Sequence, residues 1–239
     1  MRTIRLGSAV WCLWALGVSP ALGAGRDDLN GVWLYTGSDT PEELYLTPAG
    51  QAMLDAYEPL IDDSDNYCIP ASFTNIMHTP SPPFEIRLHE EHVEINYEFL
   101  DVKRRVPFED ADDSSRSLAE APHSVEAHPH LGRSLARFEG ETLVIDTVGI
   151  GEGYLDTLDV PGLPRSSQMQ TQERFVPDGD RLEVVVTHRD PVNYTRDLIV
   201  RYGFHRLDSE ILPWDCEPDA ASYDRYLERS PRSLRSTPE

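Results

Sequence analysis

Two carboxylates, Glu98 and Glu173, lie at the end of or within alternating strand patterns and have arginines as near neighbours. Burial in a largely apolar cavity favours the protonated form of a carboxyl group, which could then act as a general acid or base. Tyr97 and Tyr194 could assist such a group as hydrogen-bond donors. The alternative, which we prefer, is that the two glutamates form structural ion pairs on a sheet with neighbouring arginines such as Arg105.

Three histidines, His123, His128 and His130, form a spaced cluster in a polar stretch at residues 109–130. Imidazoles two residues apart can share a Zn²⁺ or Cu²⁺ ion. The stretch has the composition of a long surface loop, so we expect solvation or adventitious binding there and predict no dedicated metal site. A Gly-x-Ser-x-Gly elbow, a His-Glu-x-x-His motif and a phosphate-binding glycine loop are absent from the sequence, and we predict no cofactor.

Residues 1–23 have the organisation of a signal peptide. Arg2 and Arg5 precede an apolar run at residues 10–18, and small residues precede the expected cleavage before Ala24. The run is about half as long as a membrane-spanning helix requires, which favours cleavage over an N-terminal anchor. Cleavage removes two arginines and no acidic residue, so the formal charge of −21 becomes −23. We therefore expect a periplasmic or secreted protein with no stable membrane insertion.

Two cysteines, Cys68 and Cys216, remain after cleavage. An even cysteine count in an oxidising compartment favours a disulfide, and two buried free thiols are the alternative. In the chain-entropy model, closing a loop of roughly 150 residues stabilises a fold by about 4 kcal/mol or more. No Cys-x-x-Cys pair is present, which disfavours a zinc site built on cysteine.

The elements that must position these residues are mostly short strands. Several segments alternate with a period of two, as Val93, Ile95 and Tyr97 do. One short helix is predicted at residues 47–57, and residues 61–83 are expected to be irregular. This pattern predicts a single, mainly β, antiparallel barrel or sandwich domain at residues 24–221, followed by a charged tail at 222–239. The predicted strands cover residues 30–35, 84–88, 93–99, 102–108, 134–138, 142–147, 168–175, 181–188 and 198–205.

Two details favour a barrel that resembles the lipocalins. The first predicted strand contains Gly31-x-Trp33, and Gly-x-Trp is typical of lipocalin-type barrels, whose tryptophan closes the barrel base. Such barrels often place an arginine across this tryptophan, because a guanidinium stacks well on an indole. Arg201, or Arg206 as a second choice, could do so here. Trp33 could equally be an ordinary core residue; the resemblance implies a lipocalin-like cup with one ligand-sized cavity.

A second resemblance covers roughly residues 29–218. Residues 131–147 read LGRSLARFEGETLVIDT, and this stretch resembles the GHS-G-RWEGDTLVV-T stretch of a family of uncharacterised exported bacterial proteins. Both cysteines fall at matching motif positions, so the resemblance supports a Cys68–Cys216 disulfide. The resemblance implies export. It implies no particular activity, because the family has no settled one. Shorter matches are Leu46-Thr47-Pro48-Ala49-Gly50, Cys68-Ile69-Pro70, Ile76-Met77, Glu173-Arg174-Phe175, Asp190-Pro191, Tyr194-Thr195 and Cys216-Glu217.

The chain departs from this family pattern at two positions, where Arg133 and Arg165 replace histidines. Two matched changes suggest that the two segments meet in space. The arginines, together with Ser134 and Ser166, would then form a permanently cationic site for a carboxylate or a phosphate. The alternative, to which we give more weight, is that both arginines are surface residues paired with local acids.

The composition narrows the possible functions. The chain has 42 acidic against 21 basic residues, which disfavours a nucleic-acid partner because phosphate contacts need clustered Lys and Arg. Our leading hypothesis is an exported binding protein for a small, partly apolar molecule, which could be anionic. Two alternatives remain: a cofactor-independent isomerase, cyclase or hydrolase that uses Glu98 or Glu173, and a structural or interaction module of the cell envelope. A barrel fold alone does not separate them.

Overall fold

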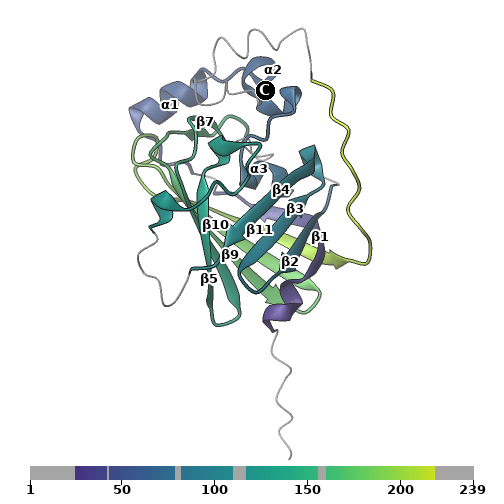
Figure 1. Cartoon of the computed structure of the whole chain (residues 1–239). Coiled ribbons are helices and arrows are strands. Elements are labelled where there is room, and N and C mark those ends of the chain that lie inside the picture. Colours follow the sequence, from purple (N-terminus) through teal and green to yellow (C-terminus); the bar gives the residue numbers. More distant parts are fainter. Residues whose placement is uncertain (1–24, 42, 79–81, 110–116, 156–159, 219–239) are drawn as a thin grey trace, which may run out of the picture.

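The computed structural model describes residues 25–41, 43–78, 82–109, 117–155 and 160–218 (Figure 1). The predicted signal peptide at 1–23 and the charged tail at 222–239 lie outside these ranges. In the described ranges, no helix is long and apolar enough to cross a membrane.

Nine antiparallel strands form one sheet in the order β4-β3-β2-β1-β11-β10-β9-β6-β5, and two short strands, β7 and β8, pair separately. The sheet curls until its edge strands β4 and β5 meet at a bridge between Phe108 and Ala136. The prediction of a mainly β, antiparallel barrel is confirmed, and the barrel is nearly closed. The strands are β1 (Gly31–Asp39), β2 (Phe84–Leu88), β3 (His92–Tyr97), β4 (Val102–Pro107), β5 (Arg133–Glu139), β6 (Thr142–Val148), β7 (Gly153–Tyr154), β8 (Pro164–Arg165), β9 (Gln170–Asp178), β10 (Arg181–Arg189) and β11 (Leu198–Leu207).

The number of strands determines how the barrel closes. Each of the nine strands is antiparallel to its neighbours in the sheet. The first and the ninth strand, β4 and β5, therefore run in the same direction, and their bridge is parallel. A single backbone bond, from the Glu109 nitrogen to the Ala136 oxygen at 2.7 Å, accompanies this bridge. Farther along, the Arg105 nitrogen donates to the Ser124 oxygen at 2.8 Å, so residues 117–132 fill the gap between the edge strands.

The segment at 117–132 corrects one expectation. Residues 109–130 were predicted to be a surface loop, yet Ala121, Ser124 and Val125 are buried. The prediction was wrong for these residues because their polar neighbours face outward while they cover the gap beside β4. Residues 110–116 of the stretch lie outside the described ranges.

The base of the barrel is built around Trp33, whose side chain is fully buried and donates from Nε1 to the Leu29 oxygen at 3.0 Å. The guanidinium of Arg206 lies 4.4 Å from the centre of the Trp33 ring, as in the predicted lipocalin-type arrangement. Arg201 was the wrong first choice, since it pairs with Glu183 on the outer surface. Gly31 has a φ of +135°, and a Cβ there would lie 2.5 Å from Arg206 Nη1, so this position requires glycine.

Helices cover the opposite end of the barrel (Figure 1). The predicted helix at 47–57 is confirmed as α1 (Pro48–Asp55), with the Thr47 hydroxyl accepting from the Gly50 nitrogen. The expectation that residues 61–83 are irregular was wrong, because they contain a 3-10 helix at Ser64–Tyr67 and the helix α3 (Phe73–His78), and they begin with the last two residues of α2 (Pro59–Asp62). All six residues of α3 are buried. A helix enclosed on every side has no amphipathic pattern, which explains why the sequence did not reveal it.

Candidate functional site

The interior of the barrel contains a bidentate ion pair between Arg104 on β4 and Glu173 on β9. Arg104 Nη1 lies 2.9 Å from Glu173 Oε1 and Nη2 lies 2.6 Å from Oε2. Neither side chain is exposed to solvent. The two strands alternate, so Arg104 shares the inner face of β4 with Val102 and Val106.

Polar and aromatic side chains surround this ion pair. Nη2 of Arg104 also donates to the hydroxyls of Ser134 and Thr147, each at 3.3 Å. The ring of Phe73, on α3, lies 3.5 Å from the Arg104 guanidinium carbon. Burial alone would lower the pKa of Arg104, but Glu173 and Tyr97 raise it above its usual value. Arg104 is therefore a permanent cation inside the barrel.

A second polar group lies beside the first and involves Arg165 on β8 and His188 on β10. Both side chains are almost fully buried, and Arg165 Nη1 donates to the Ala71 oxygen. His188 Nδ1 lies 3.0 Å from the Thr171 hydroxyl. Within the described residues, His188 Nε2 has no hydrogen-bond partner. This nitrogen is thus a buried polar atom that a small molecule could engage.

A cavity of about 20 Å³ is lined by members of both polar groups: Glu173 of the first, and Arg165 and His188 of the second. It is large enough for about one water molecule. Its lining includes both polar and apolar side chains. The lining residues are Ser72, Phe73, Thr74, Leu131, Ile150, Leu155, Arg165, Thr171, Glu173, Val186 and His188.

Two buried histidines should make stability depend on pH. Burial and the nearby Arg165 lower the pKa of His188 to about 3, and burial lowers that of His130 to about 4. Both values lie below the usual histidine pKa of about 6.5, so the unfolded chain takes up these protons first. The stabilisation that depends on the neutral histidines is therefore fully present above about pH 6.5. As the pH falls below this value, the free energy of unfolding decreases by up to about 1.4 kcal/mol per pH unit for each histidine.

Urea denaturation between pH 7.5 and 5 measures this slope before most carboxylates titrate. We expect the variant His130→Gln to lose only part of it, because burial also lowers the pKa values of His188 and His128. His205→Ala is the control variant, because this replacement removes an exposed imidazole and leaves the buried ones in place. A flat profile for the unmodified protein would show that these histidines are not buried in the neutral form.

Several of the predicted site residues are buried and hydrogen-bonded to protein partners. Ser134 belongs to the Arg104 network, and its hydroxyl lies 2.8 Å from that of Thr147. Ser166 donates from both its nitrogen and its hydroxyl to Asp190, at 2.8 and 2.7 Å. Tyr194 donates to the Pro164 oxygen at 2.9 Å.

The remaining predicted site residues have separate positions. Arg133 is half-buried and donates to the Ala121 oxygen, whereas Arg165 binds Ala71, so the two guanidinium groups contact different backbone segments. Glu98 lies outside the barrel interior and accepts from the Leu212 nitrogen at 2.6 Å.

Of the residues predicted to form structural ion pairs, Glu173 and Arg174 form ion pairs with partners that were not predicted, whereas Glu98 accepts the backbone bond from Leu212 described above. Glu173 pairs with Arg104 and not with Arg105, because Arg105 is on the outer face of β4. Arg174 pairs with Glu139 at 2.7 Å on the surface. Arg104, noted in the sequence as a neighbour of Arg105, and His188 were not among the predicted site residues. Both alternate in their strands with buried valines, and this pattern could have identified them.

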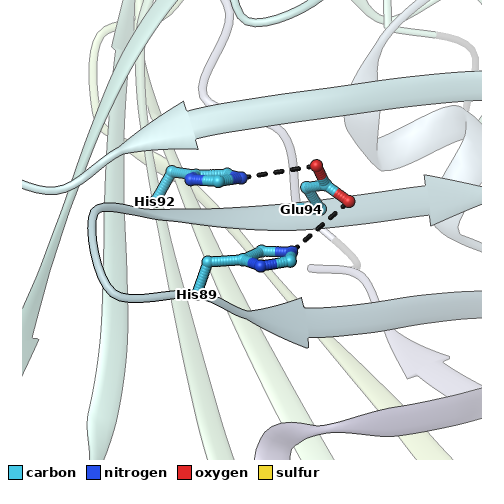
Figure 2. A group of neighbouring side chains, drawn as sticks. All are labelled: His89, His92 and Glu94. Carbon is cyan, nitrogen blue, oxygen red and sulfur yellow. Dashed lines mark hydrogen bonds and ion pairs between the residues drawn. The ribbon is translucent and has the colours of Figure 1, made fainter.

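The three histidines of the cluster at 123–130 do not all come together: the rings of His128 and His130 are in edge contact, with centres 5.7 Å apart, and His123 is separate. His123 is exposed, whereas His130 is buried and lies 2.9 Å from the Pro70 oxygen. Among the described residues, one different group of three metal-capable side chains comes together: His89, His92 and Glu94, on the β2–β3 hairpin (Figure 2).

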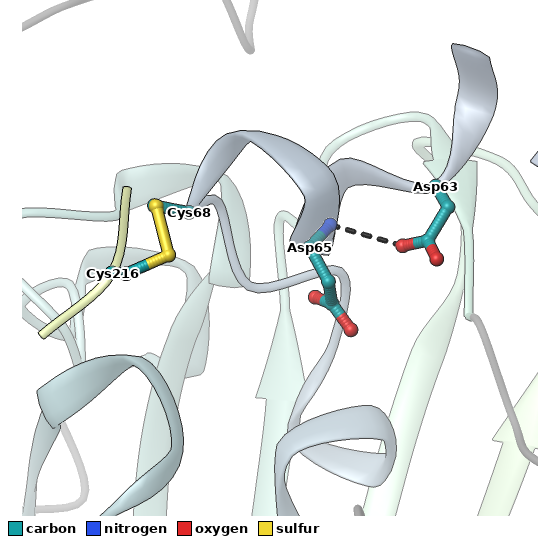
Figure 3. The surroundings of a disulfide bond; sticks show 4 residues. All are labelled: Asp63, Asp65, Cys68 and Cys216. Carbon is teal, nitrogen blue, oxygen red and sulfur yellow. Dashed lines mark hydrogen bonds between the residues drawn. A yellow bond between two sulfur atoms is a disulfide. The ribbon is translucent and has the colours of Figure 1, made fainter. Parts of the chain in front are cut away.

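The predicted disulfide between Cys68 and Cys216 is present (Figure 3). Cys68 follows a short 3-10 helix, η2 (Ser64–Tyr67), whose first turn is capped by the Asp63 carboxylate. Residues 208–216 follow β11, and this C-terminal segment runs along the outside of the barrel to the helical end (Figure 1). The disulfide is compatible with an extracytoplasmic location.

The strand order and the closed interior define the class: a mainly β, antiparallel barrel with helices over one end. No family model and no curated protein matches the chain. Among solved structures, the apo form of Caenorhabditis elegans lipid binding protein 8 is 12% identical, with a TM-score of 0.37, and the match covers 76% of this chain and 96% of that one. A mutant of the fluorescent protein UnaG is 13% identical, with a TM-score of 0.38 and coverage of 77% and 99%. Likeness at these TM-scores carries no weight of its own, so the barrel class rests on the strand order.

Proposed function

We propose that the protein is an exported binding protein for a small, partly apolar molecule that carries one polar or anionic group. The observation that supports this most directly is the enclosed cavity between Arg165, His188 and Glu173. Its apolar residues suit a hydrocarbon part, and its cationic and imidazole groups suit an oxygen acceptor. The signal-like sequence at 1–23 and the disulfide support export.

The cavity holds about one water as described, so a larger ligand must displace side chains of α3. Phe73 is the main obstacle, because it lines the cavity and stacks on Arg104. The proposal therefore includes a bound state in which α3 shifts away from the barrel interior. Hydrogen exchange of the α3 amides should then change when a ligand binds.

The binding test uses octanoate as an anionic probe and octanol as its uncharged counterpart, each titrated into the mature protein by calorimetry. We expect octanoate to bind more tightly than octanol, and Arg165→Met to weaken octanoate by about tenfold to a hundredfold, the range of a charge-assisted hydrogen bond. Arg133→Met is the matched control and should bind octanoate as the unmodified protein does, because its guanidinium contacts Ala121 instead.

Arg165 is buried, so its replacement could impair folding. The variant His188→Phe keeps the residue's approximate size, removes the imidazole and should also weaken octanoate. Native mass spectrometry of the protein from an exporting host gives an independent result, since a co-purified ligand adds mass. Absence of both added mass and any response to the two probes would contradict the proposal.

A second candidate, a structural or interaction module of the envelope, is favoured by the small volume of the described cavity. It predicts the negative outcome of both experiments. The geometry gives the enzyme alternative no comparable support. Both Glu173 oxygens bind Arg104, and Glu98 lies outside the barrel interior.

A further inference from the structure

The hairpin between β2 and β3 places two histidines opposite each other. Leu88 pairs with Val93, and the His89 nitrogen donates to the His92 oxygen at 2.9 Å, so two residues form the turn. Val93 faces the core, which puts its strand neighbours His92 and Glu94 on the outer face. The three side chains His89, His92 and Glu94 therefore share one surface.

The backbone holds this arrangement in place. The Phe108 nitrogen donates to the Glu91 oxygen at 2.9 Å, which ties the turn to the end of β4. The imidazole rings of His89 and His92 are stacked, with centres 4.4 Å apart and planes 9° from parallel. A site whose ligands are already oriented loses less conformational entropy on binding.

The ligand atoms have distances suited to one small cation. His89 Nε2 lies 3.5 Å from Glu94 Oε2, and His92 Nε2 lies 3.3 Å from Glu94 Oε1 (Figure 2). Two ligands of a tetrahedral Zn²⁺, bound at about 2.0–2.1 Å, are about 3.3 Å apart. One ligand atom from each of the three residues lies within 4.8 Å of the others.

We propose that His89, His92 and Glu94 form a binding site for a divalent transition metal ion of the Zn²⁺ type. Two imidazoles and one carboxylate are three protein ligands, and Zn²⁺ commonly takes a fourth from solvent. Each imidazole would bind the metal through Nε2, the nitrogen that faces Glu94. The site is partly exposed, with His89 42% and His92 13% accessible, so the remaining coordination position is open to water.

Two arginines modify this site. Glu94 lies between Arg87 on β2 and Arg105 on β4, its cross-strand neighbours. Arg87 is paired with Glu85 at 2.9 Å. Arg105 Nη2 lies 3.4 Å from His92 Nδ1, where it opposes the Nδ1 proton that a metal-bound Nε2 requires. Removal of the Arg105 charge should therefore increase metal affinity.

The test is calorimetric titration of Zn²⁺ into the mature, disulfide-bonded protein. We expect one ion per chain, and a loss of affinity of more than about a hundredfold in His89→Ala and in Glu94→Gln, because losing a direct ligand should exceed the roughly 10–100-fold effect of an outer-shell neighbour. Arg105→Gln should raise the affinity. His205→Ala, which removes an exposed histidine from the outer face of β11, should leave it unchanged.

Nuclear magnetic resonance of the histidine rings supplies a readout that does not depend on affinity. Zn²⁺ should shift the Nε2 resonances of His89 and His92 and leave that of His205 in place. The proposal is overturned if the unmodified protein binds no Zn²⁺. It is also overturned if His89→Ala binds as tightly as the unmodified protein while His123→Ala does not, which would assign the metal to the loop at 123–130.

Discussion

The variant Glu173→Gln should lower the free energy of unfolding by about 3–5 kcal/mol, the usual cost of removing one partner from a buried ion pair. Glutamine has nearly the same size, so the loss does not come from a cavity. It comes from the charge of Arg104, which would remain inside the barrel without an anion. Urea denaturation followed by tryptophan fluorescence measures the change.

The matched control is Arg174→Gln, the next residue on β9, whose side chain lies on the outer face. Its ion pair with Glu139 is about one-third or more exposed on both sides, so we expect a change below about 1 kcal/mol. The double variant Arg104→Met with Glu173→Leu removes both charges and should be more stable than Glu173→Gln alone. Equal effects of Glu173→Gln and Arg174→Gln would contradict the buried pair.

The second large effect concerns the disulfide. Replacement of both Cys68 and Cys216 by Ser should lower the free energy of unfolding by about 5 kcal/mol, since the bond closes a loop with a sequence separation of 148. The C-terminal segment, residues 208–216, should also detach. Its noncovalent contacts include a hydrogen bond from the Leu212 nitrogen to Glu98 and an edge contact between the rings of Trp214 and Phe99, whose centres are 5.1 Å apart.

Thermal unfolding measures the loss of stability. The emission maximum of Trp214 reports the detachment of the C-terminal segment. A reducing agent should have the same effect on the unmodified protein and none on the double variant. An unchanged unfolding temperature together with unchanged emission would show that the segment is held by its noncovalent contacts and that the disulfide adds little.

The strands could be predicted because only the inner face of the barrel wall is apolar, so apolar residues recur at every second position of a strand. Val93, Ile95 and Tyr97 alternate in the sequence and are all buried. Helix α3 was not predictable in the same way. Its six residues are all enclosed by the barrel end, and this burial depends on strands that are distant in the sequence.

The sequence identified some charged residues of the candidate site. It did not identify which side chains pair with each other. Glu173 and Arg165 were both identified, and both line the cavity. The pairing of Glu173 with Arg104 was not predicted. Arg174 is adjacent to Glu173 in the sequence, but consecutive residues of a strand point to opposite faces. Likewise His89 and His92 are separated by two turn residues, and only the hairpin register brings their rings together.

The link between Cys68 and Cys216 makes a covalent ring of most of the chain. Strands β2 to β11 all lie between these two cysteines, and β1, which precedes Cys68, inserts between β2 and β11 of that ring. A protease that cuts once anywhere between the two cysteines therefore releases no fragment. The nicked protein keeps both pieces joined, and they can reassociate as a unimolecular process whatever the protein concentration.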